Sequence, residues 1–296
     1  MIRSMTGYGA AERVDPDVRI AVEIRTVNNR FFKASLHLPE GLGAVEVAID
    51  KILRATITRG TVSLTLGVEP RGAAARVPIN KDILQAYLKD LEGVAGGWSR
   101  KVYSNGLLGF VLALPGVVGG QDVLLTGIDN LPARIEAVVT EGVARLNAMR
   151  DAEGQTTAAD MRATLEEMEK WLAAVDARVP AVIEEYRQRL RERVTALLEG
   201  VEIALDDQVL AREVAFAAER SDINEEIARL RSHVGQFREL LVESGPGGRK
   251  LEFITQEMYR EVNTMGAKSN DSEISRLVVS VKVGVDRLRE QSQNVE

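Results

Sequence analysis

From about residue 129 to residue 296 the sequence pattern is helical almost throughout, and this run constrains the fold more than any other feature. Pro180 interrupts the run. Because proline lacks the backbone N–H and clashes with the preceding turn, we expect two helices or one kinked helix around Val179. Asp129, and Thr156 or Thr157, are the expected N-caps of this part. Further helices are predicted at 207–220, 222–243, 249–265 and 272–294.

The first 70 residues read as strands with one helix. Between Val18 and Arg25 apolar residues alternate with Arg19, Ala21 and Glu23, the pattern of a half-buried strand. Turn residues follow, so we predict a hairpin with a second strand at 31–38. The remaining pattern predicts a helix at 43–58, a strand at 61–68, a connector at 71–76, a helix at 80–95 and an unassigned glycine-punctuated stretch at 96–127.

These patterns predict an α+β protein with two parts, as its length of 296 residues also favours. An N-terminal, strand-rich α+β domain is expected at 1–155. A long all-helical C-terminal region, expected at 156–296, carries the candidate catalytic motif.

Composition excludes several classes of protein. The chain has no cysteine, which excludes disulfides and thiolate chemistry, and it shows neither a signal peptide nor an apolar stretch of membrane-spanning length. A cytoplasmic protein without a membrane partner is therefore expected. Aromatic residues make up only 4% of the chain, which argues against a base-stacking platform and favours recognition of nucleic acid by shape and phosphate charge.

The charge distribution indicates where a phosphate backbone would bind. The net charge is −6, yet residues 1–80 hold 11 Lys and Arg against 8 Asp and Glu. Since affinity for phosphates comes from Lys and Arg, the N-terminal part is the expected backbone holder.

Polar residues repeat along the segment that starts at Ser221. Asp222 and Glu225 fit a capping box, in which Asp222 is the N-cap and Glu225 bonds back to its N–H. Glu225, Arg229 and His233 then project from one side of the helix. The ordinary interpretation of such a stripe is a solvated face.

The segment 249–273 holds the densest set of reactive side chains. Glu257 and Glu261 lie one helical turn apart and are able to share one cation. The alternatives are a solvated pair and compensation by Arg260 or Lys250. The following loop offers Lys268, Ser269 and Asn270, with Asp271 or Ser272 as the cap of the next helix. A cation, donors and metal ligands are what phosphoryl chemistry needs, although a plain helix–loop–helix corner explains the same residues.

Several common motifs are absent. The glycine-rich loop 245–248, followed by Arg249 and Lys250, lacks Walker spacing, and neither a Gly-x-Ser-x-Gly elbow nor a His-Glu-x-x-His helix occurs.

Five stretches together resemble the YicC/YloC family of bacterial endoribonucleases, in order and spacing from residue 2 to residue 296. They are RSMTGYG, VEIRTVNNRFFK, NAMRDAEG, AERSDINEEIARLRSHVGQFRELL and, above all, GRKLEFITQEMYREVNTMGAKSND. The resemblance implies a divalent-metal-dependent endoribonuclease, using Mg2+ or Mn2+, that acts on single-stranded or structured RNA in RNA decay and small-RNA turnover. It also implies a ring-like homo-oligomer, a hexamer, that opens to admit RNA.

The family motifs also imply roles for individual residues. The catalytic set is Glu257, Glu261, Lys268 and His233, and the metal ligands are Glu257, Glu261 and Glu273. The RNA-binding residues are Arg25, Asn28, Arg30, Arg249, Lys250 and Arg260. This chain departs from the family pattern at Ala34, where members commonly carry an acidic residue, and at Gly235, where a larger side chain is usual. An acidic role near Phe32 is thereby in doubt.

The expected mechanism is hydrolysis, with Lys268 and an arginine stabilising the charged transition state and His233 acting as general acid. Two alternatives come from other classes of protein. One is a non-catalytic RNA-binding adaptor that presents small RNAs to another nuclease, and the other is a purely structural helical scaffold.

Overall fold

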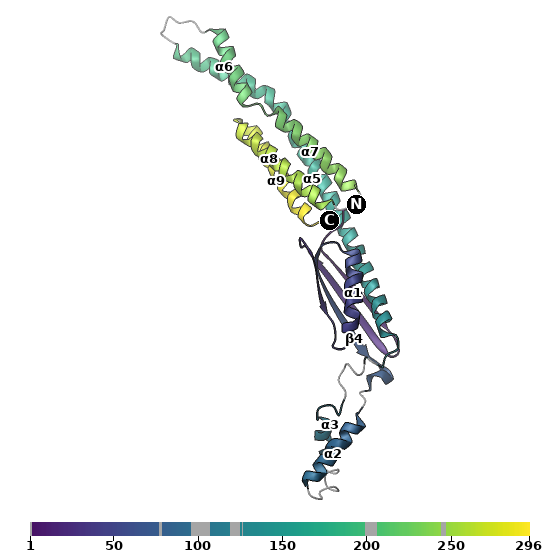
Figure 1. The fold of residues 1–296 in the computed structure, drawn as a ribbon. Helices are drawn as coiled ribbons and strands as arrows, with labels where there is room; N and C mark the ends of the chain where they lie inside the picture. The colour runs from purple at the N-terminus through teal and green to yellow at the C-terminus, as the bar shows by residue number, and fades with distance from the viewer. Residues whose placement is uncertain are drawn as a thin grey trace. The chain divides into compact units, whose positions relative to one another are not determined.

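The computed structural model describes residues 2–76, 79–95, 107–118, 125, 127–198, 206–243 and 247–296. Two compact units divide the chain: a sheet unit, Thr6–Met149, and a helical unit, Met1–Met5 with Arg150–Glu296 (Figure 1). The predicted α+β class, with a strand-rich N-terminal part and a long helical region after it, is confirmed. Of the helices described, none combines the length and the apolar character needed to cross a membrane.

The sheet unit is built on four strands in the order β1-β2-β4-β3, namely Gly7–Val14, Val18–Val27, Gly60–Pro70 and Phe32–His37. β1 pairs with β2 and β2 with β4 in antiparallel fashion, whereas β3 runs parallel to β4. The predicted hairpin between β2 and β3 is therefore wrong, because β4 lies between them. Parallel neighbours need a crossover, and helix α1, Gly43–Thr56, supplies it.

The core of the sheet unit lies on one face of the sheet. The alternation predicted for β2 is confirmed, since its apolar residues from Val18 to Ile24 are buried, and the α1 stripe of Val45, Ile49 and Leu53 is buried with them. The first part of helix α5, Leu131–Leu197, packs on the same face. Gly9 allows α5 to approach β1 closely, because a Cβ at this position would lie 2.4 Å from the Gly142 carbonyl oxygen.

The rest of the described part of the sheet unit includes a short connector and two helices. The connector expected at 71–76 contains a 3-10 turn, Gly72–Ala75, and the expected helix at 80–95 is α2, Lys81–Ala95. Helix α3, Leu107–Leu112, falls in the unassigned stretch, much of which (96–106, 119–124 and 126) lies outside the described residues.

Helix α5 passes through Pro180 as one continuous helix, so the expectation of two helices is wrong. Val179 and Val182 pack against the core of the helical unit on both sides of the proline and hold this turn in place. Thr156 and Thr157 are not N-caps either. Both lie inside α5, where their hydroxyls donate to the carbonyl oxygens of Ala152 and Glu153. The helix begins two residues after Asp129.

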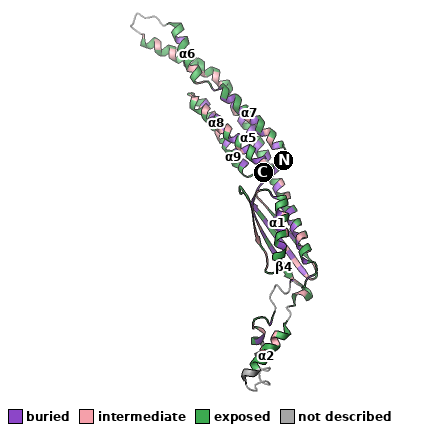
Figure 2. Ribbon diagram, in the orientation of Figure 1, coloured by how far each residue is buried: buried purple, intermediate pink, exposed green. Residues whose placement is uncertain are grey.

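The other helices of the helical unit follow the predicted segments closely. They are α6 at Asp207–Arg220, α7 at Asn224–Val242, α8 at Gly248–Lys268 and α9 at Ser272–Gln293. One apolar stripe from each of α7, α8 and α9 packs with the α5 stripe from Met161 to Val175 into a single core. Helix α6 differs, because within it only Leu210 is buried (Figure 2).

A buried arginine joins segments of the helical unit that are distant in sequence. Arg150 is fully buried; its Nε donates to the Ser4 carbonyl oxygen at 2.7 Å, and its Nη2 donates to Glu296 Oε1 at 2.7 Å. Beside it Arg3 forms an ion pair with Asp151, and a Cβ on Gly154 would lie 2.5 Å from the Ile2 carbonyl oxygen. The stretches RSMTGYG and NAMRDAEG thus bind each other.

Candidate functional site

Helices α7 and α8 pack side by side (Figure 1). A row of charged residues, the polar seam, runs along their contact. The seam consists of Glu226 and Arg229 from α7 with Glu261 and Lys268 from α8. Each helix buries an apolar stripe, which fixes the neighbouring polar positions of both helices against one another. His233 and Glu257 extend this row, one helical turn beyond Arg229 and Glu261 respectively.

At one end of the polar seam, Lys268 binds a buried carboxylate. Its Nζ donates to Glu226 Oε1 at 2.8 Å, and the Glu226 side chain is only 7% exposed. This hydrogen bond raises the pKa of Lys268 above its ordinary value, so the ammonium stays charged. Glu226 Oε2 is also buried and has no hydrogen-bond partner among the described residues. Glu226 was not predicted as a site residue, because helical spacing indicates only neighbours on the same helix and its partner lies 42 positions away.

The centre of the polar seam is Glu261, whose side chain is 7% exposed. Arg229 Nη1 lies 3.6 Å from Glu261 Oε1 and also pairs closely with Glu225. Neither Arg260 nor Lys250 compensates Glu261, contrary to one of the alternatives. Lys250 pairs instead with Glu243 at 3.3 Å. Arg260, the residue after Tyr259, lies on another side of α8 and is exposed.

The predicted capping box is wrong. Asp222 accepts from the N–H of Asn224, but its own N–H donates to the carbonyl oxygen of Glu219 rather than to Glu225. Glu225 reaches forward along the helix to Arg229, four residues on, where opposite charges attract.

The two remaining catalytic candidates of the seam are less constrained. Glu257 is half-buried and has no hydrogen bond or ion pair with any described residue. His233 is half-buried as well, and its Nδ1 atom is buried without a partner among the described residues.

Glu273 lies in a different cluster, at the start of α9. Arg178 of α5 contacts Glu273 Oε2 at 3.3 Å, Asp271 at 3.0 Å and Glu185 at 2.6 Å. Asp271 also caps α9, as predicted, and accepts from the N–H groups of Glu273 and Ile274. The hydrogen bond from Arg178 lowers the pKa of Asp271 below its ordinary value, and the N–H of Ile274 adds to this effect. Over the described ranges, no three His, Asp or Glu side chains converge into a metal-ligand group.

The expected RNA-binding residues are divided between the two units. Arg249 and Arg260 are exposed on α8, and Arg249 with Lys250 lines a shallow open pocket of about 720 Å³. In the sheet unit the Arg25 guanidinium lies 5.6 Å from the ring centre of Tyr8 and pairs with Glu23 at 3.4 Å. Arg30 stacks over Phe31 at 5.4 Å, in the loop that also contains the exposed Asn28.

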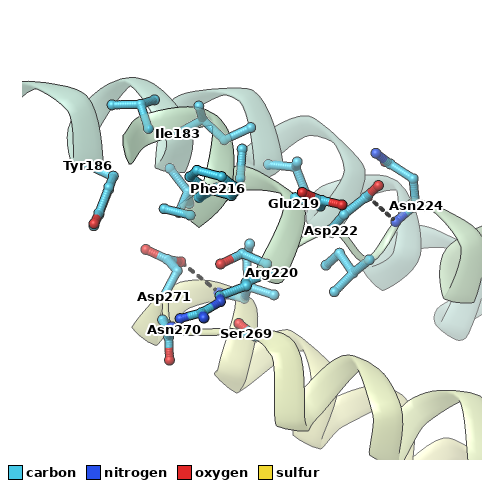
Figure 3. A pocket seen from close by; sticks show the side chains of 18 of the residues that line it. Ile183, Tyr186, Phe216, Glu219, Arg220, Asp222, Asn224, Ser269, Asn270 and Asp271 are labelled. Carbon is cyan, nitrogen blue, oxygen red and sulfur yellow. Dashed lines mark hydrogen bonds between the residues drawn. The ribbon is translucent and has the colours of Figure 1, made fainter. Parts of the chain in front are cut away.

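A second pocket of the helical unit, the corner pocket, was not predicted (Figure 3). The corner pocket has a volume of about 640 Å³. Two of its walls are residues of α5 between Val179 and Arg189 and the second half of α6. The α6–α7 corner at 221–224 and the α8–α9 corner at 269–271 complete the lining. Two separate stretches that carry the family resemblance, AERSDIN and GAKSND, therefore meet around one cavity. Their meeting depends on how α6 and α8 pack, which periodicity does not reveal.

Comparisons with known proteins agree over the whole chain. The family model described as endoribonuclease YicC-like, N-terminal region, matches residues 2–159, and the model described as endoribonuclease YicC-like, C-terminal, matches residues 175–296. A probable endoribonuclease YicC of Clostridioides difficile (strain 630) is 30% identical over 297 residues, and one of Haemophilus influenzae is 33% identical over 301 residues. Both alignments cover 100% of this chain and of the relative.

Proposed function

The chain belongs to the YicC-like endoribonuclease family, and from this premise we propose that it is a divalent-metal-dependent endoribonuclease of single-stranded or structured RNA. Its roles would be RNA decay and small-RNA turnover in the cytoplasm. The polar seam supports this proposal, because it combines carboxylates, cations and an imidazole on two packed helices.

The observation that carries the proposal is the pair Glu257 and Glu261. Mg2+ commonly binds one or two carboxylates together with substrate phosphates, and Glu257 has no competing partner among the described residues. Glu257 and Glu261 would hold Mg2+ or Mn2+, which when bound supplies an activated water and stabilises negative charge. Glu273 fits less well, since it would first have to leave Arg178.

The neighbouring side chains of the seam support the chemistry of phosphate transfer. Lys268 is held in its charged form by Glu226 and would stabilise negative charge on the phosphate. Arg229 lies between Glu225 and Glu261 and would share this role. His233, which is half-buried one helical turn from Arg229, would protonate the leaving oxygen.

A non-catalytic RNA-binding adaptor remains the second candidate. The observation in its favour is that Glu226 and Glu261 already have cationic partners, which accounts for both acids without catalysis. In either case we propose a ring-like homo-oligomer, a hexamer. Exposed apolar residues at the end of α5 and in α6, including Leu197 and Val209, support such an assembly, and light scattering would measure its mass.

The first prediction concerns cleavage itself. Purified protein incubated with end-labelled RNA should cut it in Mg2+ or Mn2+ and should stop cutting in EDTA. Hydrolysis does not use the 2′-OH, so RNA with a 2′-deoxy sugar at the cut should still be cleaved and should yield 5′-phosphate and 3′-OH ends. Products with 2′,3′-cyclic phosphate formed in EDTA would contradict the hydrolytic mechanism, and intact RNA under every metal condition would favour the adaptor.

The second prediction concerns the sheet unit. Arg25→Ala and Arg30→Ala should weaken RNA binding equally across sequences, because phosphate contacts carry no sequence information. Each lost contact should lower the slope of log affinity against log salt by about 0.7 for a single strand. Fluorescence anisotropy at several salt concentrations measures both effects. Arg71→Ala, an exposed arginine of the same unit, is the control. A changed sequence preference would show instead that Arg25 or Arg30 contacts bases.

A further inference from the structure

The corner pocket has the construction of a small-molecule site. Its volume of about 640 Å³ falls in the range of about 300–1,000 Å³ that is usual for ligand pockets. Apolar side chains from α5 and α6, among them Ile183 and Phe216, form one wall (Figure 3). Phe216 is 56% exposed, which leaves its ring available to a ligand.

Unused hydrogen-bonding groups surround this apolar wall. Within the described part of the chain, the side chains of Arg220, Glu219 and Asn270 make no hydrogen bond or ion pair. The hydroxyl of Ser269 is buried and has no partner there either. Arg220, Glu219 and Asn270 are exposed and available to a ligand, whereas a buried hydroxyl such as that of Ser269 is rarely left unpaired. A cavity that gathers these groups fits a ligand with several donors and acceptors.

The charges of the corner pocket indicate what kind of ligand fits. The described lining holds the acidic residues Glu213, Glu219, Asp222 and Asp271 against the arginines Arg189 and Arg220. Arg189 donates to the Glu185 carbonyl oxygen, whereas the Arg220 side chain has no partner among the described residues. This acidic excess disfavours a phosphate group. It favours a flat, neutral group that presents N–H donors on one edge and acceptors on another.

We propose that the corner pocket binds one unstacked guanine base of the RNA, an inference that rests on the proposed function. Guanine carries the acceptors O6 and N7, which suit Arg220, and the donors N1–H and N2–H, which suit the Glu219 carboxylate. In Figure 3 Glu219 lies beside Asp222, whereas Arg220 extends toward Ser269 and Asn270, so the two groups meet different edges of a ligand. Phe216 stacks on the base.

The other bases fit this arrangement less well. Adenine lacks the O6 acceptor and presents an acceptor, N1, where Glu219 needs a donor. Cytosine and uracil lack N7 and so do not offer Arg220 the paired acceptors O6 and N7 of guanine. Because unpaired buried polar groups are costly, the mismatch should be measurable as base preference.

The test uses guanosine 5′-monophosphate and the full-length protein. Calorimetry should show this nucleotide binding about tenfold more tightly than the adenosine, cytidine and uridine monophosphates, the selectivity expected from one good bidentate contact. Arg220→Gln and Glu219→Gln should each remove this preference, and Phe216→Leu should weaken all four nucleotides. The matched control is Arg212→Gln, an exposed arginine of α6 outside the pocket. Melting temperatures equal to wild type will show that each variant folds.

Mapping of cut sites separates this inference from the proposed nuclease activity. Wild-type cuts should have guanine at one fixed position, and Arg220→Gln should lose that bias while total cleavage continues. Equal affinity for the four nucleotides, or identical behaviour of Arg220→Gln and Arg212→Gln, would overturn the guanine pocket and leave the nuclease proposal intact. Selective guanosine monophosphate binding by a protein that cuts no RNA would support the pocket and contradict the nuclease.

Discussion

Glu257→Gln is expected to lower the rate of RNA cleavage by about 100-fold while leaving stability unchanged. The amide keeps the shape of the side chain but removes the charge that a divalent cation needs, and losses of about 10- to 100-fold follow even from changes around metal ligands. Stability should hold because Glu257 makes no hydrogen bond or ion pair with a described residue. Single-turnover rates at saturating Mg2+ and Mn2+, with thermal melting alongside, measure the two effects.

Glu261→Gln should reduce cleavage as strongly but should also lower the melting temperature. Glu261 is buried and lies 3.6 Å from Arg229, so its charge contributes to the polar seam as well as to the proposed chemistry. Glu252→Gln, on a half-buried residue of the same helix, is the control. Turnover like that of wild type in both Glu257→Gln and Glu261→Gln would show that α8 does not carry the catalytic site.

Arg150→Met should have the largest effect on stability, lowering the free energy of unfolding by about 3–5 kcal/mol. Methionine fills much of the space, yet it removes the hydrogen bonds that Arg150 donates to the Ser4 carbonyl oxygen and the Glu296 carboxylate. Urea denaturation monitored by circular dichroism measures the loss. Arg145→Met, whose exposed side chain pairs with Glu141 one turn earlier and donates to the Ala10 carbonyl oxygen, should cost only about 1 kcal/mol. Similar curves for Arg150→Met and Arg145→Met would show that the buried arginine adds little.

Sequence patterns located most helices and strands because each pattern reports burial along one segment. The alternation that starts at Val18 was sufficient to locate β2, and the helical stripe that starts at Val45 was sufficient to locate α1. The pairing of the strands did not follow from these local patterns. The turn residues after β2 suggested a local hairpin, but β3 found its partner in β4, a contact between segments that α1 separates. Pro180 left two alternatives, two helices or one kinked helix, and the structure has one helix, since tertiary packing holds the turn that the proline alone would weaken.

The candidate site shows the same division between local and long-range information. Helical spacing predicted that Glu257 lies near Glu261, and that Asp271 caps the next helix. It gave no information on the partners Glu226 and Lys268, or on the corner pocket, because these depend on which helices pack together. Glu273 illustrates the limit most clearly. It is close to Lys268 in sequence, yet Arg178 on α5 holds it in another cluster.

The pairing of the first residues with the last has a consequence for synthesis on the ribosome. Backbone hydrogen bonds join Arg3 to Glu296 in both directions, and Met5 donates to Asn294. The sheet unit, residues 6–149, emerges from the ribosome complete and is free to fold at once. The helical unit must wait until residue 296 has emerged, on the order of 10 s later at ordinary elongation rates. Until then Arg3 and Met5 lack their backbone partners in residues 294–296, so nascent chains stalled before that point should remain sensitive to protease within the helical unit.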